Sequence, residues 1–384
     1  MYDFDKEIQR RRTKCVKWDS DFVTETVKPM WVADMDFKVA PAIIKSLQDV
    51  VSRGVFGYQL LSEDYYRSIS SWFKNRHQFE VSREEICYLP NVVMGLSFAV
   101  QTVSEPGDEI IIQTPVYGPF FKVVEDNGRV LKENPMKNEN GYYTMDLKDF
   151  EDQITEKTKA VILCNPHNPA GRVWKKEELQ KLADICVKHD LIIISDDIHS
   201  EIVFKDYEHT FIAQLSEKIA DRTITFTSPS KAFNLASVHV ANAFIKNKEL
   251  REKFVGLVER SHAANCNAFA EAALTAAYDE SAQWLDEAVE YLEGNIEYFV
   301  DYIHSEIPEL KVRKPEGTYL VWVDFTGTKV ENAHDFLIQK CHVAVNDGSF
   351  FGKEGKDYVR FNLACPRSTI LPVLEEIKKE IQKL

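Results

Sequence analysis

The sequence has few of the patterns that mark metal-binding, disulfide-bonded or membrane proteins. Its 384 residues include seven cysteines with no C-x-x-C pair, and ten histidines with no H-E-x-x-H motif. This spacing predicts neither a disulfide framework nor a zinc site, so we expect no metal. No run of about 18 apolar residues occurs, and residues 1–20 lack the apolar stretch of a signal peptide. We therefore expect a reduced, cytoplasmic protein without a membrane partner.

An excess of positive charge is also missing. The formal net charge is −14, and the one basic cluster, Arg10–Arg12 with Lys14 and Lys17, follows three acidic residues. Binding to a nucleic-acid backbone needs a basic face, so this balance argues against a nucleic-acid partner. The basic cluster itself is typical of a mixed-charge, solvated N-terminal arm rather than of a targeting signal.

Length and apolar patterning indicate an α/β protein with more than one domain. Single cores stop growing near about 250–300 residues, and this chain is longer. From about residue 85 to 245, short apolar runs alternate with helical patterns such as Lys175–His189, which predicts a doubly wound, mostly parallel sheet. The predicted strands are Glu109–Gln113, Ala160–Cys164, Leu191–Ser195, Thr223–Thr227 and Ala241–Ile245.

The C-terminal part of the chain has a different pattern, which predicts a second, smaller α+β domain. A long helix is expected from about Ser281 to His304, strands at Glu309–Arg313 and Tyr319–Asp324, and an amphipathic helix over Arg367–Leu384. We expect residues 1–44 to form an N-terminal arm and a small-domain segment, residues 45–282 the large domain, and residues 283–384 the C-terminal small domain.

Polar residues follow three of the predicted strands and carry the chemical signal. Asn165–Gly171 follows one strand, Asp196 and His199 follow the next, and Ser228–Lys231 follows a third. Alone, each has an ordinary explanation: a turn, a helix cap, or an exposed polar pair. Carboxyl ends of parallel strands meet at one sheet edge, where ligands bind. Pyridoxal phosphate (PLP) needs a lysine for a Schiff base and a carboxylate beside its pyridine nitrogen, so the combination predicts a PLP site on Lys231.

The same motifs resemble the fold-type I, aspartate aminotransferase-like PLP enzymes (the class I/II aminotransferase superfamily). The chain is similar in particular to the MalY/PatB-type branch of cystathionine β-lyase-like C–S lyases. The segments that carry this second resemblance are Pro29–Phe37, Val55–Tyr58, Ser228–Asn234 and Val359–Arg367. The resemblance implies the aspartate aminotransferase fold, whose large domain has a mostly parallel seven-stranded sheet, and a homodimer.

The resemblance also implies roles around the cofactor ring. Lys231 would form the Schiff base and later move protons at the substrate Cα. Asp196 would pair with the pyridine nitrogen, and Asn168 would donate to the phenolate oxygen. Tyr117 would stack on the ring, with a strand-end core tyrosine as the alternative. His199 stands where aminotransferases usually have tyrosine, and it either contacts the cofactor or is a packed core histidine.

For the cofactor phosphate, the resemblance implies backbone amides at a helix N-terminus, where N–H groups and the helix dipole favour an anion. Residues 232–243 contain no arginine, although aminotransferases often place a phosphate-binding arginine there. Tyr58 would reach across a dimer interface to the neighbouring phosphate. The other residues implied in phosphate binding are Val92, Val93, Met94, Ser228 and Ser230.

For the substrate, the resemblance implies that Arg360 holds the α-carboxylate, because a guanidinium can bind a planar carboxylate through two hydrogen bonds. Trp31, Ala33 and Asp34 belong to a loop that would close over this carboxylate. Arg367 lies seven residues beyond Arg360 and is interpreted as a helix-start or surface residue instead.

The resulting hypothesis is a C–S β-lyase that performs α,β-elimination on L-cystathionine or L-cysteine-type substrates, giving pyruvate, ammonia and a thiol. An aminotransferase shares every step through Cα deprotonation and is the nearest alternative; a histidinol-phosphate type would need further basic residues. A non-catalytic binding or regulatory protein would be expected to lose some of the residues named above. A serine acyltransferase built on Ser228-x-x-Lys231 would leave Asp196, Tyr117 and Arg360 without roles.

Overall fold

The computed structural model describes residues 2–384, and its largest element is a mixed seven-stranded sheet of order β2-β10-β9-β8-β7-β3-β4. β10 runs antiparallel to both of its neighbours, β2 and β9, and the other neighbouring pairs in this sheet are parallel. The predicted mostly parallel sheet is thus confirmed. Its strands are β2 Ile86–Leu89, β3 Glu109–Thr114, β4 Val130–Pro135, β7 Thr158–Cys164, β8 Ile192–Asp196, β9 Thr223–Thr227 and β10 Ala241–Phe244.

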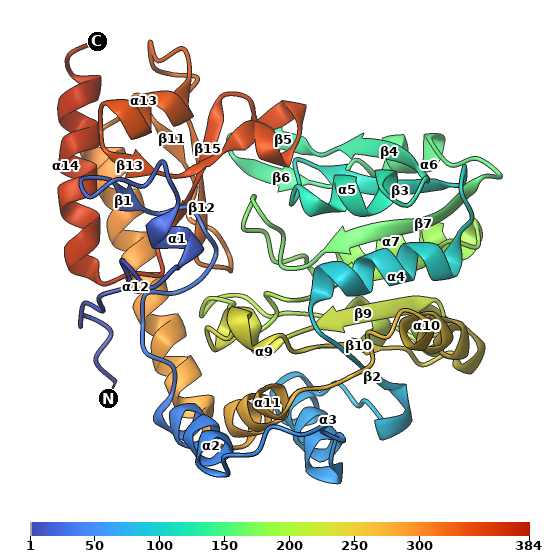
Figure 1. Ribbon diagram of the computed structural model, residues 1–384. Coiled ribbons are helices and arrows are strands. Elements are labelled where there is room, and N and C mark those ends of the chain that lie inside the picture. The colour runs from blue at the N-terminus through green and yellow to red at the C-terminus, as the bar shows by residue number, and fades with distance from the viewer. Residues whose placement is uncertain (1) are drawn as a thin grey trace.

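Helices cover both faces of this sheet because its central strands are apolar on both sides (Figure 1). In β3, Ile110 and Ile112 belong to one apolar core, while Ile111 between them belongs to another. The first core is closed by α4 Val92–Val103, α5 Pro119–Glu125 and α10 Lys248–Arg260. The opposite core is closed by α6 Leu147–Asp152 and α7 Lys176–Lys188.

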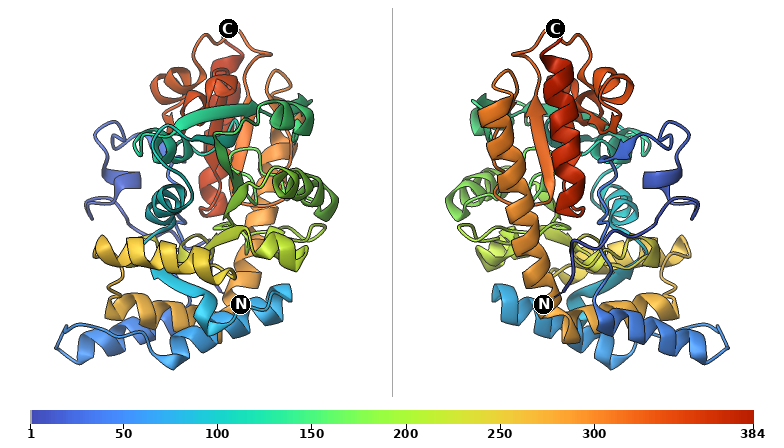
Figure 2. Two further views of the ribbon diagram at one scale, coloured as in Figure 1. Left: turned by 90° about the vertical axis from the view of Figure 1, so that its right-hand side faces the viewer. Right: turned by 90° about the vertical axis from the view of Figure 1, so that its left-hand side faces the viewer.

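The helix α12 (Ala282–Glu306) connects two apolar cores along its length. Its first turns pack with α2 Pro41–Ser52, α3 Glu63–His77 and α11 Ala268–Glu280. Its last turns pack with the second sheet and with α14 (Ile370–Ile381), which runs beside it in both views of Figure 2. The remaining short elements are the β5 Lys137–Glu139 and β6 Tyr142–Thr144 hairpin, α8 Glu217–Ala220 and α9 Pro229–Ala232.

The second sheet lies in the C-terminal part and has the order β11-β12-β15-β14. A separate two-stranded sheet, the parallel pair of β1 with β13, joins the N-terminal segment to this part of the chain. The predicted boundary at 44 falls inside α2, and that at 282 falls at the start of α12, so the domain division stays a prediction. The elements are β1 Lys28–Pro29, β11 Lys311–Val312, β12 Leu320–Asp324, β13 Val343–Ala344, β14 Asn346–Asp347, β15 Tyr358–Asn362 and α13 Ala333–Gln339.

The N-terminal arm is packed on the protein rather than solvated. The prediction of a solvated arm is therefore wrong for Arg10 and Lys17. The Lys17 side chain is 1% exposed, and its Nζ lies 2.7 Å from Asp36 Oδ2. Arg10 donates to Asp34 Oδ2 at 2.7 Å and to Asp36 Oδ1 at 2.6 Å. These carboxylates are 17 or more residues away along the chain, so the linear pattern could not reveal them. The arm, with the short helix α1 (Val16–Asp19), therefore anchors the segment that follows β1.

The seven cysteines are all free thiols. No helix within residues 2–384 combines the length and the apolar character needed to cross a membrane.

Candidate active site

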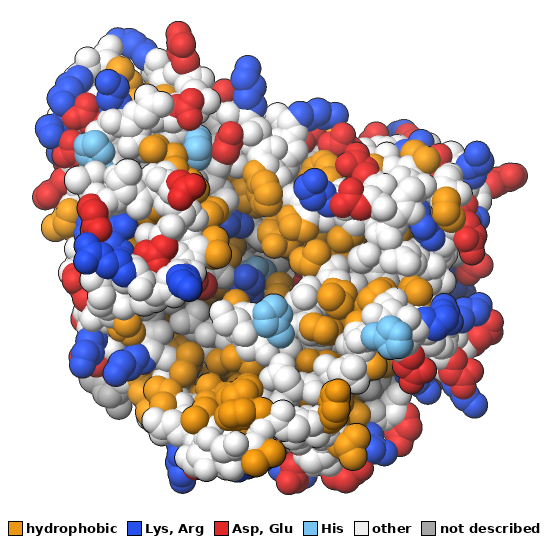
Figure 3. Space-filling view, in the orientation of Figure 1, with side chains coloured by type: hydrophobic (Ala, Val, Ile, Leu, Met, Phe, Trp, Pro, Cys, Tyr) orange, Lys and Arg blue, Asp and Glu red, His pale blue; other side chains and the backbone are white. Residues whose placement is uncertain are grey.

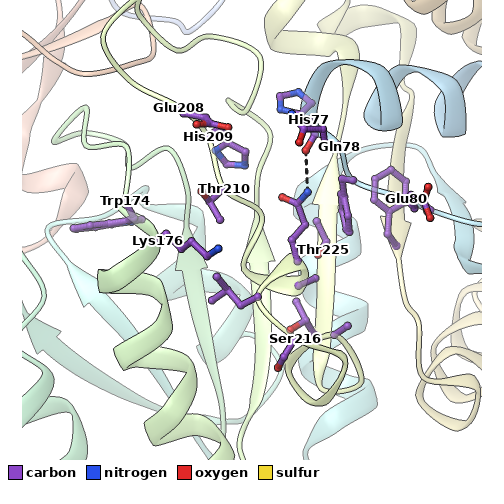
Figure 4. Close-up of a pocket in the computed structure, with 18 of the residues that line it drawn as sticks. His77, Gln78, Glu80, Trp174, Lys176, Glu208, His209, Thr210, Ser216 and Thr225 are labelled. Carbon is purple, nitrogen blue, oxygen red and sulfur yellow. Dashed lines mark hydrogen bonds between the residues drawn. The ribbon is translucent and has the colours of Figure 1, made fainter.

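Several hollows lie in the described part of the chain, and two of them are candidates for a ligand site. The larger, of about 1180 Å³, is a groove whose lining includes His77, Lys176 and His209 (Figure 4). A smaller cavity, of about 330 Å³, lies at the carboxyl edge of the main sheet and shares no lining residue with the groove. Only the smaller one gathers the residues that the sequence singles out: it is lined by Trp31, Ala33, Val92, Val93, Tyr117, Asn168, Asp196, His199, Ser228, Ser230, Lys231 and Arg360.

The parallel strands bring these residues together because they all end at this edge. Tyr117 follows β3, Asn168 follows β7, Asp196 ends β8, and Lys231 follows β9. Lys231 lies in the short helix α9, whose N-cap is Ser228. The Ser228 hydroxyl accepts from Ser230 N at 3.0 Å and donates to the Val240 carbonyl at 2.6 Å. Its proton is therefore engaged in holding the turn that presents Lys231.

Lys231 lies in surroundings that favour a neutral amine. Its Nζ donates to the Ala33 carbonyl at 2.8 Å, and the hydroxyl of buried Tyr319 donates to the same oxygen at 3.0 Å. Burial, followed by the charge of Arg360, lowers the pKa of Lys231 to about 8. A lysine with this pKa is partly deprotonated near neutral pH and can act as a nucleophile or base. Tyr319 was expected only as a strand residue, and nothing in its local sequence points to this contact.

Asp196 is a buried carboxylate at the end of β8. Its Oδ1 accepts from Ile198 N at 3.2 Å. Burial raises the pKa of Asp196 to about 7, since removal from water disfavours the charged form. A cation placed beside this carboxylate would restore its ionised form. Asp196 is thus suited to pair with a protonated ring nitrogen of a bound ligand.

The Asp196→Asn variant should gain stability relative to the unaltered cofactor-free protein as the pH rises from about 5 to 8. The folded state keeps a proton on Asp196 between the ordinary pKa of 3.8 and the folded value of about 7. The stabilisation that this proton gives the folded state is complete below the ordinary pKa of the carboxyl group. It is lost as the pH rises through the pKa that Asp196 has in the folded state. A difference of one in pKa between the folded and unfolded states corresponds to about 1.4 kcal/mol, so this stabilisation amounts to a few kcal/mol. Thermal melting across this pH range measures the difference.

The matched control is Asp21→Asn at an exposed position, which should melt like the unaltered protein at every pH. If Asp196→Asn showed the same pH slope as the unaltered protein, the burial effect on Asp196 would be refuted.

Arg360 reaches the cavity from β15 in the second sheet. It donates through Nη1 to Asn168 Oδ1 at 2.9 Å, and through Nη2 to Asn346 Oδ1 at 2.6 Å and the Trp31 carbonyl at 3.1 Å. Burial lowers the pKa of Arg360 to about 10, which leaves it charged at neutral pH. Asn346 is a site residue that sequence reasoning missed, because it lies in a short β14 with no motif around it.

Two buried nitrogen atoms at this cavity have no hydrogen-bond partner within residues 2–384: Arg360 Nε and His199 Nδ1. Buried polar groups are nearly always paired in native proteins. Both residues line the cavity. The unpaired atoms therefore mark the cavity as a place completed by a polar ligand.

Three residues expected in the site lie outside this cavity. Met94 does not line it, and its N–H is bonded to the side chain of Asn91, the N-cap of α4, at 2.9 Å. Val92 and Val93, the first two residues of α4, both line the cavity, and amides at these positions of a helix have no intrahelical partner. Asp34 is paired with the N-terminal arm instead. Tyr58 is fully exposed and away from its own cavity.

The family model for aminotransferase class I and II matches residues 31–377. The chain belongs to this family. It is 37% identical over 382 residues to "Cystathionine beta-lyase PatB" of Bacillus subtilis (strain 168), covering 98% of this chain and 99% of that protein. The predicted resemblance is therefore confirmed.

Solved structures of family members have the same fold over their whole length. Cystalysin from Treponema denticola, which contains pyridoxal 5'-phosphate, superposes with a TM-score of 0.97 at 36% identity, covering 100% of this chain and 99% of that one. A PLP-bound putative aminotransferase from Clostridium difficile 630 superposes with a TM-score of 0.96 at 40% identity, covering 99% of this chain and 100% of that one. The expected aspartate aminotransferase-like fold is confirmed.

Proposed function

We propose that this protein is a PLP-dependent C–S β-lyase that converts L-cystathionine and related S-substituted L-cysteines to pyruvate, ammonia and a thiol. The observation that carries the proposal is the meeting of Lys231, Asp196, Asn168 and Arg360 in one cavity. The name of the relative PatB and its similarity over nearly the whole of both chains support elimination as the reaction.

The cavity fits PLP in size and in its polar groups. Its volume of about 330 Å³ is within the range of small-ligand sites, and its lining includes His199, whose buried Nδ1 has no partner within residues 2–384. Lys231 would hold the cofactor aldehyde, Asp196 the ring nitrogen, and Tyr117 one ring face. The phosphate would lie at the N-terminus of α4, where Val92 and Val93 have free amides. When bound, PLP withdraws electrons from the substrate Cα and stabilises the charge left by proton removal.

The chain's own residues would orient the substrate and move its proton. Arg360 binds the α-carboxylate and so fixes the direction of the Cα–H bond. Lys231, neutral once it is released, takes the proton from Cα. The Cβ–S bond then breaks with its electron pair on sulfur, which leaves as a thiolate and takes up a proton. One water is consumed, so that the carbon skeleton leaves as pyruvate and the nitrogen as ammonium.

We expect the purified, PLP-loaded protein to release pyruvate and ammonium from L-cystathionine without any added 2-oxo acid. Elimination needs no amino-group acceptor, whereas transamination does. Coupled assays for pyruvate and for ammonium, with and without 2-oxoglutarate, distinguish the two reactions. The alternative to be tested is aminotransferase activity, which the name of the Clostridium difficile neighbour favours. Amino-group transfer that requires the 2-oxo acid, with no pyruvate in its absence, would reject the lyase.

We further propose a homodimer in the cytoplasm. The loop before α3 exposes four large apolar or aromatic side chains, at Val55, Phe56, Tyr58 and Leu60. Exposed apolar patches of this kind are typical of subunit interfaces. By the family resemblance, Tyr58 would reach the phosphate in the partner's cavity. The free thiols agree with a reducing compartment.

A further inference from the structure

The outer wall of the cavity is aromatic, and this has a consequence for the leaving group. We propose that the site selects S-substituted cysteines whose leaving thiol is uncharged and apolar, and that Phe350 is the residue that makes this selection. L-cystathionine, whose leaving thiol carries both an ammonium and a carboxylate, would be turned over but would be the poorer substrate. This inference rests on the proposed lyase function and specifies its substrate class.

Few charged side chains line the cavity, and each of them already has a role in the proposed reaction. The charged side chains that line it are Asp196, Lys231 and Arg360. His199 adds none, because burial lowers its pKa well below its usual range. The remaining lining side chains are apolar or carry neutral hydroxyl, amide or thiol groups. A distal ammonium or carboxylate would therefore lose hydration without gaining an ion pair in this chain, which weakens binding.

Phe350 is a half-exposed aromatic ring in the lining of this cavity. It is 47% exposed, and its ring centroid lies 6.3 Å from that of Tyr117 and 5.2 Å from that of Phe351. A Cβ atom at Gly118 would come within 2.7 Å of Phe350 Cζ, so the ring occupies the space that this glycine leaves. Phe350 is thus held in place before a ligand binds, with apolar surface left for one to cover.

A second aromatic residue, Trp31, lines the same cavity from the segment after β1. Its Nε1 donates to the Lys17 carbonyl at 3.0 Å, and its ring packs edge-on against Phe22 with centroids 5.0 Å apart. Hydrophobic side chains border the central hollow of the face shown in Figure 3. An apolar substituent on the substrate sulfur would gain contact area with these rings, whereas a charged one would not.

The test compares kcat/KM for pyruvate release from three substrates: S-benzyl-L-cysteine, L-cystathionine and β-chloro-L-alanine. We expect the unaltered protein to prefer S-benzyl-L-cysteine to L-cystathionine by at least about tenfold. Phe350→Ala should lower kcat/KM for S-benzyl-L-cysteine about tenfold and leave β-chloro-L-alanine nearly unchanged, because chloride does not reach the wall. The control Tyr207→Ala removes a half-exposed aromatic from the other groove and should change none of the three.

A second variant adds a charge instead of removing a ring. Phe350→Arg should shift the preference toward L-cystathionine, whose distal carboxylate would gain a partner. Equal or better turnover of L-cystathionine by the unaltered protein would overturn the inference, as would a loss in Phe350→Ala that is the same for all three substrates. Absence of pyruvate even from β-chloro-L-alanine would overturn the proposed function, and this inference with it.

Discussion

Replacing Lys231 with alanine should lower the rate of pyruvate release from L-cystathionine by at least about a thousandfold. In the proposed reaction the Lys231 side chain both holds the cofactor and moves the Cα proton. Within residues 2–384 no other lysine lines the cavity. Among the described residues, the Lys231 side chain has one hydrogen bond, to the Ala33 carbonyl, so loss of this side chain should leave the fold intact. Steady-state kinetics with the PLP-loaded variant measure the effect.

Borohydride reduction followed by peptide mass spectrometry tests the covalent part of this role. The unaltered protein should carry the reduced cofactor on the peptide that contains Lys231, and the variant should not. The matched control is Lys176→Ala, which removes an exposed lysine from the larger groove in Figure 4 and should keep full activity. Cofactor attached to a different lysine, or undiminished turnover by Lys231→Ala, would show that the cofactor site lies elsewhere in the protein.

Arg360→Lys should lower kcat/KM for amino-acid substrates by about a hundredfold, mainly through KM. The arginine uses its two terminal nitrogens to contact Asn168 and Asn346, and a lysine ammonium cannot reproduce that planar arrangement. A buried lysine would also give up its proton more readily than arginine, so the carboxylate would lose its charged partner. Kinetics over a range of substrate concentrations separate KM from kcat.

The control for this prediction is Arg367→Lys. Arg367 is exposed and donates through Nε to Asn295 Oδ1 at 3.0 Å, outside the cavity. It should therefore affect stability slightly and kinetics little. A KM for Arg360→Lys within a few-fold of the unaltered value would mean that another group binds the α-carboxylate.

Much of the fold could be predicted from local patterning. The five strands expected between residues 109 and 245 are all present, with ends shifted by at most two residues. The helix expected from about Ser281 spans Ala282–Glu306, but the C-terminal helix begins at Ile370 rather than at Arg367. The strand expected over Glu309–Arg313 is only Lys311–Val312. Long apolar runs fix the central elements, whereas short edge strands depend on the partner beside them.

The fate of the charged arm shows where local patterning fails. Lys17 has the composition of a solvated residue but is buried against Asp36, and Asp34 is turned toward Arg10 instead of the cavity. Met94 likewise looks like a free helix-start residue, yet Asn91 already takes its amide. In each case the partner is chosen by three-dimensional proximity, which hydrophobic periodicity does not encode.

The sequence by itself determined the edge of the sheet at which chemistry is expected. Apolar runs identified parallel strands, and parallel strands end at the same edge, so Asn168, Asp196 and Lys231 had to converge. Only the tertiary structure decided what stands opposite them. It places Arg360 on Asn168 across 192 residues, adds Asn346 and Tyr319, and turns Phe350 to the cavity. Arg360 and Asn346 lie in the second sheet, whereas Tyr319 precedes its strand β12 and Phe350 follows its strand β14. The position of this part of the chain depends on packing between elements and not on the repeat within any one of them.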